Sequence, residues 1–109
     1  MRLIPVPFAL AVLVLGQSLS AAQAADAENG RRLAGQWCST CHVIDSRGTG
    51  TARDTAPSFA SVAADPARVD PDHLAAWLMT GHKQMPNFNL TRDSVADLVA
   101  YIRSLGPAR

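Results

Sequence analysis

The sequence contains almost no lysine, only two cysteines and no strand-like alternation of polar and apolar residues. Lys83 is the single lysine and the formal net charge is +1 at pH 7, so the chain lacks the basic stripe that nucleic-acid binding needs. No second cysteine pair accompanies Cys38 and Cys41 to complete a zinc site. The missing strand pattern argues against the βαβ context of a disulfide reductase. A length of 109 residues allows one domain.

The two cysteines belong to the segment Cys38-Ser39-Thr40-Cys41-His42, which has the C-x-x-C-H spacing typical of c-type haem attachment. In such a site each thiol forms a thioether with one vinyl group of the haem, and the adjacent imidazole is the proximal ligand of the iron. The spacing lets one turn of backbone bring two sulfurs to neighbouring vinyl groups and the next side chain under the iron. The segment therefore predicts one covalent haem c, anchored by Cys38 and Cys41, with His42 as an iron ligand.

The first residues have the pattern of a secretory signal peptide. An unbroken apolar run occupies 8–15, and the small-x-small sequence at 22–24 fits a cleavage site. A permanent membrane anchor is the alternative, but a helix over 3–15 would reach only about 20 Å, short of the roughly 30 Å hydrocarbon core. We therefore predict a signal peptide over 1–24, cleaved at its end, and a haem domain over 25–109.

Export agrees with covalent haem attachment, which needs an oxidising or managed-thiol compartment, and the bacterial periplasm is the simplest choice. No stable membrane insertion is expected after cleavage. The remaining domain is small and would bury a modest core, to which a haem would add an apolar body. Residues 43–56 are of turn-forming types and show no periodicity, so they are predicted to be a functional loop, and wrapping the edge of a flat cofactor is one use of such a loop.

Apolar residues at helical spacing and strong capping signals predict an all-α fold. Gly30 lies on the apolar face of the first helix, which indicates either the close approach of another helix, for which Tyr101 is a candidate contact, or a tolerated surface glycine. Leu74, Trp77 and Leu78 are expected to form the inner face of the third helix. Four helices are expected, each with an N-cap residue. The first covers about 27–38 with Asp26 as its cap, and the second is a short helix over 59–63 with Ser58 as its cap. The third begins at Pro71 with Asp70 as its cap and ends at Thr80-Gly81, and the last is capped by Thr91 and stops at Gly106-Pro107.

The residue that fills the second axial position of a haem iron decides its chemistry. The residues able to do so are Met79, Met85, His73 and His82. Met79 follows apolar residues of a helix and is expected to pack in the core, and His73 is expected to face solvent. Met85 lies in a polar loop before Pro86, where a thioether has no core to join, so Met85 is the predicted ligand. Ligation by His82 and an open position are the alternatives.

These features together resemble a small bacterial class I cytochrome c, and the resemblance covers the whole chain after the leader. The resemblance implies a fold in which the helices carrying Gly30 and Tyr101 cross, with short helices and loops around one covalently bound haem. It implies His42 and Met85 as axial ligands, and a Pro57 carbonyl group that faces Nδ1 of His42. It rests on Gly30 with Leu33-Ala34, Cys38 through His42, Pro57, Leu74 with Trp77-Leu78, Met85-Pro86 and Leu98 through Ile102.

The function that the resemblance implies is that of a periplasmic one-electron carrier without catalytic residues. Its partners would be redox proteins: a dehydrogenase or quinol-oxidising complex as donor, and an oxidase or reductase as acceptor. A dedicated haem c subunit of a periplasmic oxidoreductase complex is the alternative, and an open-site gas-binding or peroxidatic protein is a further one. The chain departs from the family in having Ala56, where many relatives have glycine, and in lacking the lysine-rich docking ring of mitochondrial cytochrome c.

Overall fold

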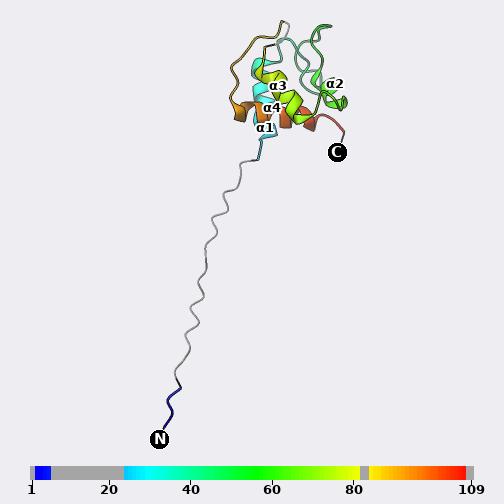
Figure 1. The fold of residues 1–109 in the computed structure, drawn as a ribbon. Coiled ribbons are helices and arrows are strands. Elements are labelled where there is room, and N and C mark those ends of the chain that lie inside the picture. Colours follow the sequence, from blue (N-terminus) through cyan, green and yellow to red (C-terminus); the bar gives the residue numbers. More distant parts are fainter. Residues whose placement is uncertain (1, 6–23, 82–83, 108–109) are drawn as a thin grey trace.

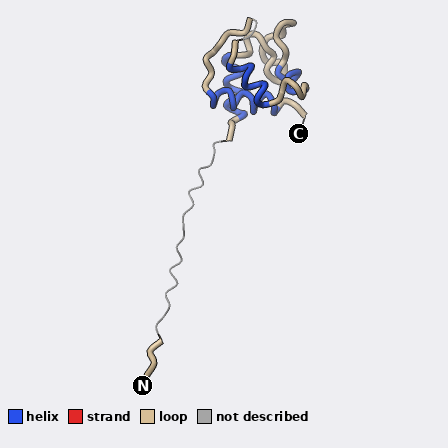
Figure 2. The backbone as a smooth tube through the Cα atoms, in the orientation of Figure 1, coloured by secondary structure: helices blue, strands red, loops and turns tan. Residues whose placement is uncertain are grey.

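The computed structural model describes residues 2–5, 24–81 and 84–107. Within these residues the chain forms helices and loops and no strand, so the expected all-α class is confirmed (Figure 1 and Figure 2). No helix in this part of the chain is long and apolar enough to cross a bilayer. Most of the predicted signal peptide, residues 6–23, lies outside the described residues. The helices are α1 (Ala27–Trp37), α2 (Phe59–Ala64), α3 (Pro71–Met79) and α4 (Arg92–Ser104).

Each helix begins at the N-cap residue that the sequence predicts. In every case the side-chain oxygen of the cap accepts a hydrogen bond from the backbone N–H three residues further on, which satisfies a donor that the helix itself leaves unpaired. A cap of this kind contributes about 1 kcal/mol. The caps and their donors are Asp26 with Asn29, Ser58 with Ser61, Asp70 with His73, and Thr91 with Ser94.

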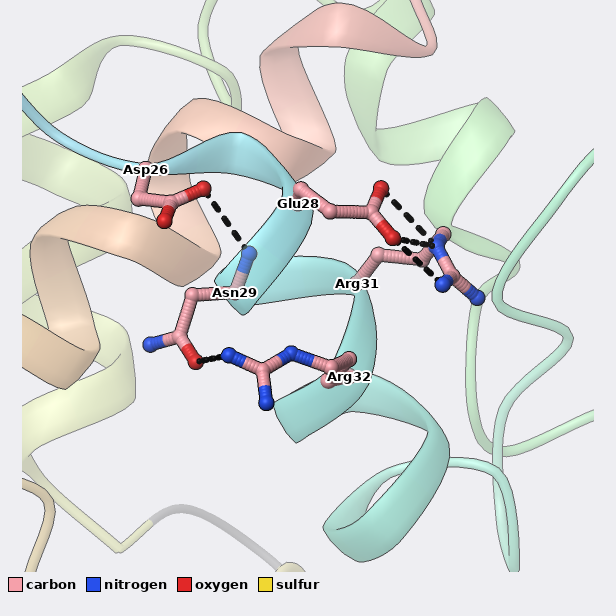
Figure 3. A network of polar contacts seen from close by, with 5 residues as sticks. All are labelled: Asp26, Glu28, Asn29, Arg31 and Arg32. Carbon is pink, nitrogen blue, oxygen red and sulfur yellow. Dashed lines mark hydrogen bonds and ion pairs between the residues drawn. The ribbon is translucent and has the colours of Figure 1, made fainter.

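The exposed side of α1 carries a network of local polar contacts (Figure 3). Nε of Arg31 donates to the carboxylate of Glu28 at 2.9 Å, and Nη2 of Arg32 donates to Oδ1 of Asn29 at 2.7 Å. The hydrogen bond from Arg31 lowers the pKa of Glu28 below its usual value. These pairs lie one helical turn apart, so they favour a continuous helix that leads into the C-x-x-C-H segment.

α1 packs mainly against α4, and the two helices cross within the helical body (Figure 1). Gly30 lies at the crossing, where a Cβ atom would stand 2.0 Å from the carbonyl oxygen of Asp97 and 2.8 Å from Cβ of Tyr101. The close approach predicted between Gly30 and Tyr101 is therefore observed. The Asp97 carboxylate joins the helices further, because it accepts hydrogen bonds from the backbone N–H of Asp26 at 2.8 Å and from Nδ2 of Asn29 at 2.7 Å.

The apolar core lies between α1 and α4, and α2 and α3 both pack on α4. α4 contributes five buried residues, spaced as one face of a helix. Leu98 and Ile102 are almost completely enclosed. The core also reaches beneath the loop that follows the C-x-x-C-H segment. Its buried apolar residues are Ala34, Cys38, Ile44, Phe59, Ala63, Val69, Leu74, Val95, Leu98, Val99, Tyr101 and Ile102.

The burial of two residues of α3 differs from the prediction. Leu74 is buried and Leu78 is half-buried against the core, but Trp77 and Met79 are 40% and 48% exposed. The predicted packing of Trp77 and Met79 in the core is therefore wrong. α3 is short and rests on α4 through a narrow stripe, so the residues that flank Leu78 stay at the surface.

Candidate functional site

The C-x-x-C-H segment forms a tight turn at the C-terminal end of α1. Cys38 is the C-cap of α1, and its carbonyl oxygen accepts hydrogen bonds from the backbone N–H groups of Cys41 at 3.1 Å and His42 at 2.9 Å. Cys38 is buried, whereas Cys41 and His42 are half-buried. The structure thus brings three of the four predicted site residues together within one turn, on a helix whose position is fixed by its crossing with α4.

Burial and, to a smaller extent, the neighbouring Cys41 raise the pKa of the Cys38 thiol to about 11. A redox-active C-x-x-C pair instead needs a thiol whose pKa is lowered by a helix N-terminus or a nearby cation. Cys38 lies at the C-terminal end of α1, where the helix dipole disfavours a thiolate. The described residues place no group of three or more Cys, His, Asp or Glu side chains around a common metal position. The surroundings of Cys38 are therefore unfavourable for disulfide exchange.

Nδ1 of the His42 ring lies 2.6 Å from the backbone carbonyl oxygen of Pro57. A carbonyl only accepts hydrogen bonds, so Nδ1 carries a proton, and in the neutral ring Nε2 then keeps its lone pair. An imidazole with one nitrogen bound to a carbonyl is oriented for metal binding through the other. The contact implied by the resemblance is present, although Ala56 rather than glycine precedes Pro57. The backbone N–H of Ala56 donates to the carbonyl of Arg53 at 3.3 Å.

The ring of Phe59 lies between His42 and α4. Its centroid is 5.4 Å from that of His42 and 6.5 Å from that of Tyr101, which it meets edge to face. The buried hydroxyl of Tyr101 donates to the carbonyl oxygen of Ile44 at 2.6 Å, and burial raises the pKa of this phenol. The sequence predicted only core packing for Phe59 and the helix crossing for Tyr101. Their contacts with His42 and Ile44 depend on how the loop folds onto α4, which no local pattern indicates.

The loop after His42 is more regular than its aperiodic sequence predicts. The Asp45 carboxylate accepts hydrogen bonds from the backbone N–H of Arg47 at 3.0 Å and of Thr49 at 2.9 Å, as in an Asx turn. Hydrogen bonding from Thr49 holds the pKa of Asp45 below its usual value. The backbone N–H of Ile44 donates to the carbonyl of Thr49 at 2.8 Å, which closes the turn beside the site.

Gly50 occupies a position in this loop that other residues would not fit. Its φ is +108°, and a Cβ atom there would stand 2.0 Å from the carbonyl oxygen of His42. The same carbonyl accepts a hydrogen bond from the backbone N–H of Thr51 at 3.2 Å. The returning loop thus holds the backbone of His42, while Pro57 and Phe59 hold its ring.

Met85 belongs to a different segment, the loop between α3 and α4. It is half-buried, whereas Pro86 and Phe88 beside it are exposed. The Phe88 ring stacks on Trp37, the last residue of α1, with ring centroids 6.1 Å apart and planes 11° apart. This stack joins the loop to α1 next to Cys38. Sequence reasoning missed the pair, because no spacing rule relates residues on two unconnected segments.

The remaining residues considered as axial ligands lie as follows. His73 is exposed in the first turn of α3, as predicted, with its ring centroid 6.1 Å from that of Trp77. Met79, at the end of α3, lines a hollow together with Val95 and Val99 of α4. His82 lies outside the described residues. The second axial ligand stays a prediction at this point.

The sequence profile of the family described as "Cytochrome C oxidase, cbb3-type, subunit III" matches residues 25–102. The chain is also 45% identical over 96 residues to cytochrome c-552 of Bradyrhizobium diazoefficiens, an alignment that covers 88% of this chain and 90% of that protein. No solved structure matches the chain with comparable significance. Since the profile and the alignment both span most of the chain, the chain belongs to the cytochrome c family of electron-transport proteins, and its cofactor is a covalently bound haem c.

Proposed function

We propose that this cytochrome c is a one-electron carrier whose haem is attached through Cys38 and Cys41 and whose iron is held between His42 and Met85. The observation that carries the proposal is the 2.6 Å contact between Nδ1 of His42 and the Pro57 carbonyl. It leaves Nε2 free on the residue that directly follows the second cysteine. An axial ligand needs both a fixed tautomer and a fixed ring plane, and this contact supplies both.

The two cysteines fit the proposed thioether bonds. Both thiols are free, and both lie in the turn that closes α1. Bound here, haem c supplies an iron that gains and loses one electron. The residues around the site hold the proposed ligand side chains in place. Phe59 and Tyr101, each 5% exposed, exclude water from the side of His42 that faces α4.

Met85 supports the function of a carrier rather than that of a catalyst. A thioether ligand stabilises ferrous over ferric iron and raises the reduction potential relative to a second histidine. If His42 and Met85 both hold the iron, it would have no open position for a substrate. The half-buried position of Met85 and the stiff Pro86 after it suit a ligand that stays in place when the charge of the iron changes.

We also propose that residues 1–24 are removed as a signal peptide and that the domain of residues 25–109 works in the periplasm. The profile match begins at residue 25, directly after the predicted cleavage site, which agrees with this boundary. The partners would be redox proteins, with a dehydrogenase or quinol-oxidising complex as donor and an oxidase or reductase as acceptor.

A dedicated haem c subunit of an oxidoreductase complex is the second candidate function. The description of the matching profile, subunit III of a cbb3-type cytochrome oxidase, favours it. The relative that aligns over 90% of its own length is named as a cytochrome and not as a subunit, which favours the free carrier. Gel filtration of the native protein separates the two, because a dedicated subunit would elute with a catalytic chain and a free carrier would elute alone.

Optical spectra of the wild-type and Met85→Ala holoproteins, oxidised and reduced, test the proposed ligands. The ferric wild type is expected to show a methionine–iron charge-transfer band, which Met85→Ala loses and the control Met79→Ala keeps. If the band survives in Met85→Ala, another residue holds the iron. Rapid binding of carbon monoxide by the reduced wild type at neutral pH would instead favour an open-site gas-binding protein.

A further inference from the structure

We propose that the stacked rings of Trp37 and Phe88 position Met85, because they fasten the Met85 loop to the end of α1 that carries the haem attachment segment. Neither ring is proposed to touch the iron, so both are positioning residues. The inference rests on the proposed ligation by Met85 and adds to it a pair of residues that holds the loop closed.

Trp37 is the fixed half of the stack. It is the last residue of α1, directly before Cys38, and its side chain is half-buried and packs against the core. α1 is itself held by its crossing with α4, where Gly30 meets the backbone of Asp97. The indole ring therefore keeps a constant position relative to the first thioether anchor.

Phe88 is the half that belongs to the loop. It lies three residues after Met85 and is 36% exposed, so the stack rather than core packing accounts for an aromatic ring at this place. The nearly parallel planes and the 6.1 Å centroid distance correspond to an offset stack, a favourable arrangement of two aromatic rings.

The chain between Met85 and Phe88 is stiff enough to pass this restraint on. Pro86 fixes its own φ angle, and the side chain of Asn87 accepts a hydrogen bond from the backbone N–H of Asn89 at 2.9 Å. The two intervening residues, with these restraints, leave the backbone few conformations. Holding Phe88 on α1 therefore limits the positions open to the Met85 thioether.

The stack acts on an equilibrium between a closed loop, with Met85 on the iron, and an open loop, with the axial position free for an added base. The rings meet in the closed state and separate in the open one, so the stack favours the closed state by its own free energy. An aromatic pair of this kind changes such an equilibrium by about two- to twelvefold.

Binding of imidazole to the ferric holoprotein measures this equilibrium, because imidazole binds after Met85 leaves the iron. Phe88→Ala is expected to bind imidazole about two- to twelvefold more tightly than the wild type, whereas Phe88→Tyr, which keeps a ring, binds it as the wild type does. Met79→Ala is the matched control, because it truncates another exposed apolar side chain outside the stack. Equal urea midpoints for Phe88→Ala and Met79→Ala would show that the difference in affinity is not a general loss of stability.

A double-mutant cycle decides whether the two rings act as a unit. If they do, Phe88→Ala has no further effect on imidazole affinity in the Trp37→Leu background. Equal imidazole affinity of Phe88→Ala and wild type, or effects of the two substitutions that simply add, would overturn the proposal.

Met85→Ala separates this failure from a failure of the proposed function. If Met85→Ala binds imidazole no more tightly than the wild type, Met85 is not the ligand and both proposals fail. If Met85→Ala binds it much more tightly while Phe88→Ala does not, ligation by Met85 stands and the positioning role of the stack is wrong.

Discussion

The segments that carry the two proposed iron ligands are held in different ways. On one side, the ring of His42 is fixed by the Pro57 carbonyl and by Phe59, which rests on α4. On the other side, Met85 lies half-buried on a loop whose Phe88 is fastened to α1 by a surface stack. One proposed ligand is thus held against a residue of the core, and the other is carried by a loop that can open at lower cost. Ligand exchange is therefore expected on the side of Met85.

The His42 segment should give the largest loss of stability when its backbone is disturbed. Gly50→Ala is expected to lower the free energy of unfolding by roughly 3 kcal/mol, since a side chain at φ +108° is strained and its Cβ atom would collide with the carbonyl of His42. Urea unfolding of the holoprotein measures the loss. The control is Gly48→Ala, where φ is +84° but the surroundings are open, with an expected loss of about 1 kcal/mol. Equal losses for the two would show that the contact with His42 does not matter.

Tyr101→Phe tests how strongly α4 supports the same segment. It removes the hydroxyl that donates to Ile44 and leaves a buried carbonyl without its partner, with an expected loss of about 2 kcal/mol in the free energy of unfolding. Ser104→Ala removes a hydroxyl of the same helix, one that bonds the Tyr101 carbonyl away from the loop, and should cost less. A Tyr101→Phe protein as stable as the wild type would mean that α4 does not support the loop.

A comparable backbone substitution in the loop of Met85 should lower the free energy of unfolding by less. Asn89 has a φ of +51°, a conformation that asparagine tolerates better than alanine. Asn89→Ala is expected to lower the free energy of unfolding by roughly 1 kcal/mol, and Asn89→Gly to leave it nearly unchanged, both measured by urea unfolding. A loss as large as that of Gly50→Ala would remove the distinction between the two segments.

The smallest expected effect concerns the turn at Asp45, and the pH dependence of the free energy of unfolding identifies it. Because hydrogen bonding from Thr49 lowers the pKa of Asp45 in the folded protein, the carboxylate stabilises the fold above its usual pKa of about 4, and this contribution disappears as the pH falls through the folded value. Asp45→Asn should therefore be less stable than the wild type at pH 7, and the difference should shrink in acid. A difference that stays constant between pH 7 and pH 3 would show that the Asp45 charge plays no part.

Local signals in the sequence predicted every helix start and gave the close approach at Gly30 as one of two interpretations, which the family resemblance then favoured. Capping depends on residues three positions apart, and the absence of a side chain at Gly30 can be read directly from the sequence. The same reasoning failed for Trp77 and Met79, which it placed in the core. Whether a residue at the edge of the apolar stripe of α3 is buried depends on how much of that helix α4 covers. The packing of the two helices sets this, and the spacing of residues in the sequence does not.

The contacts around the proposed ligands divide in the same way, into those that the sequence predicted and those that it did not. C-x-x-C-H spacing predicted the turn that gathers Cys38, Cys41 and His42, because three residues of one turn cannot lie far apart. The contact of Phe59 with His42 and the stack of Trp37 on Phe88 join segments separated along the chain. Neither pair could be found from a single sequence by pattern, because nothing local distinguishes an aromatic residue of the core from one that braces a ligand.

By itself, the sequence determined the helical class, the helix starts and the type of cofactor, because each depends on interactions within a few residues. Only the tertiary structure decided that His42 is held by the core and that the Met85 loop is tied to α1 at the surface. These arrangements depend on the crossing of α1 and α4, which sets where distant loops meet. The free energies that distinguish the two proposed ligands arise where those loops meet and not within any one segment.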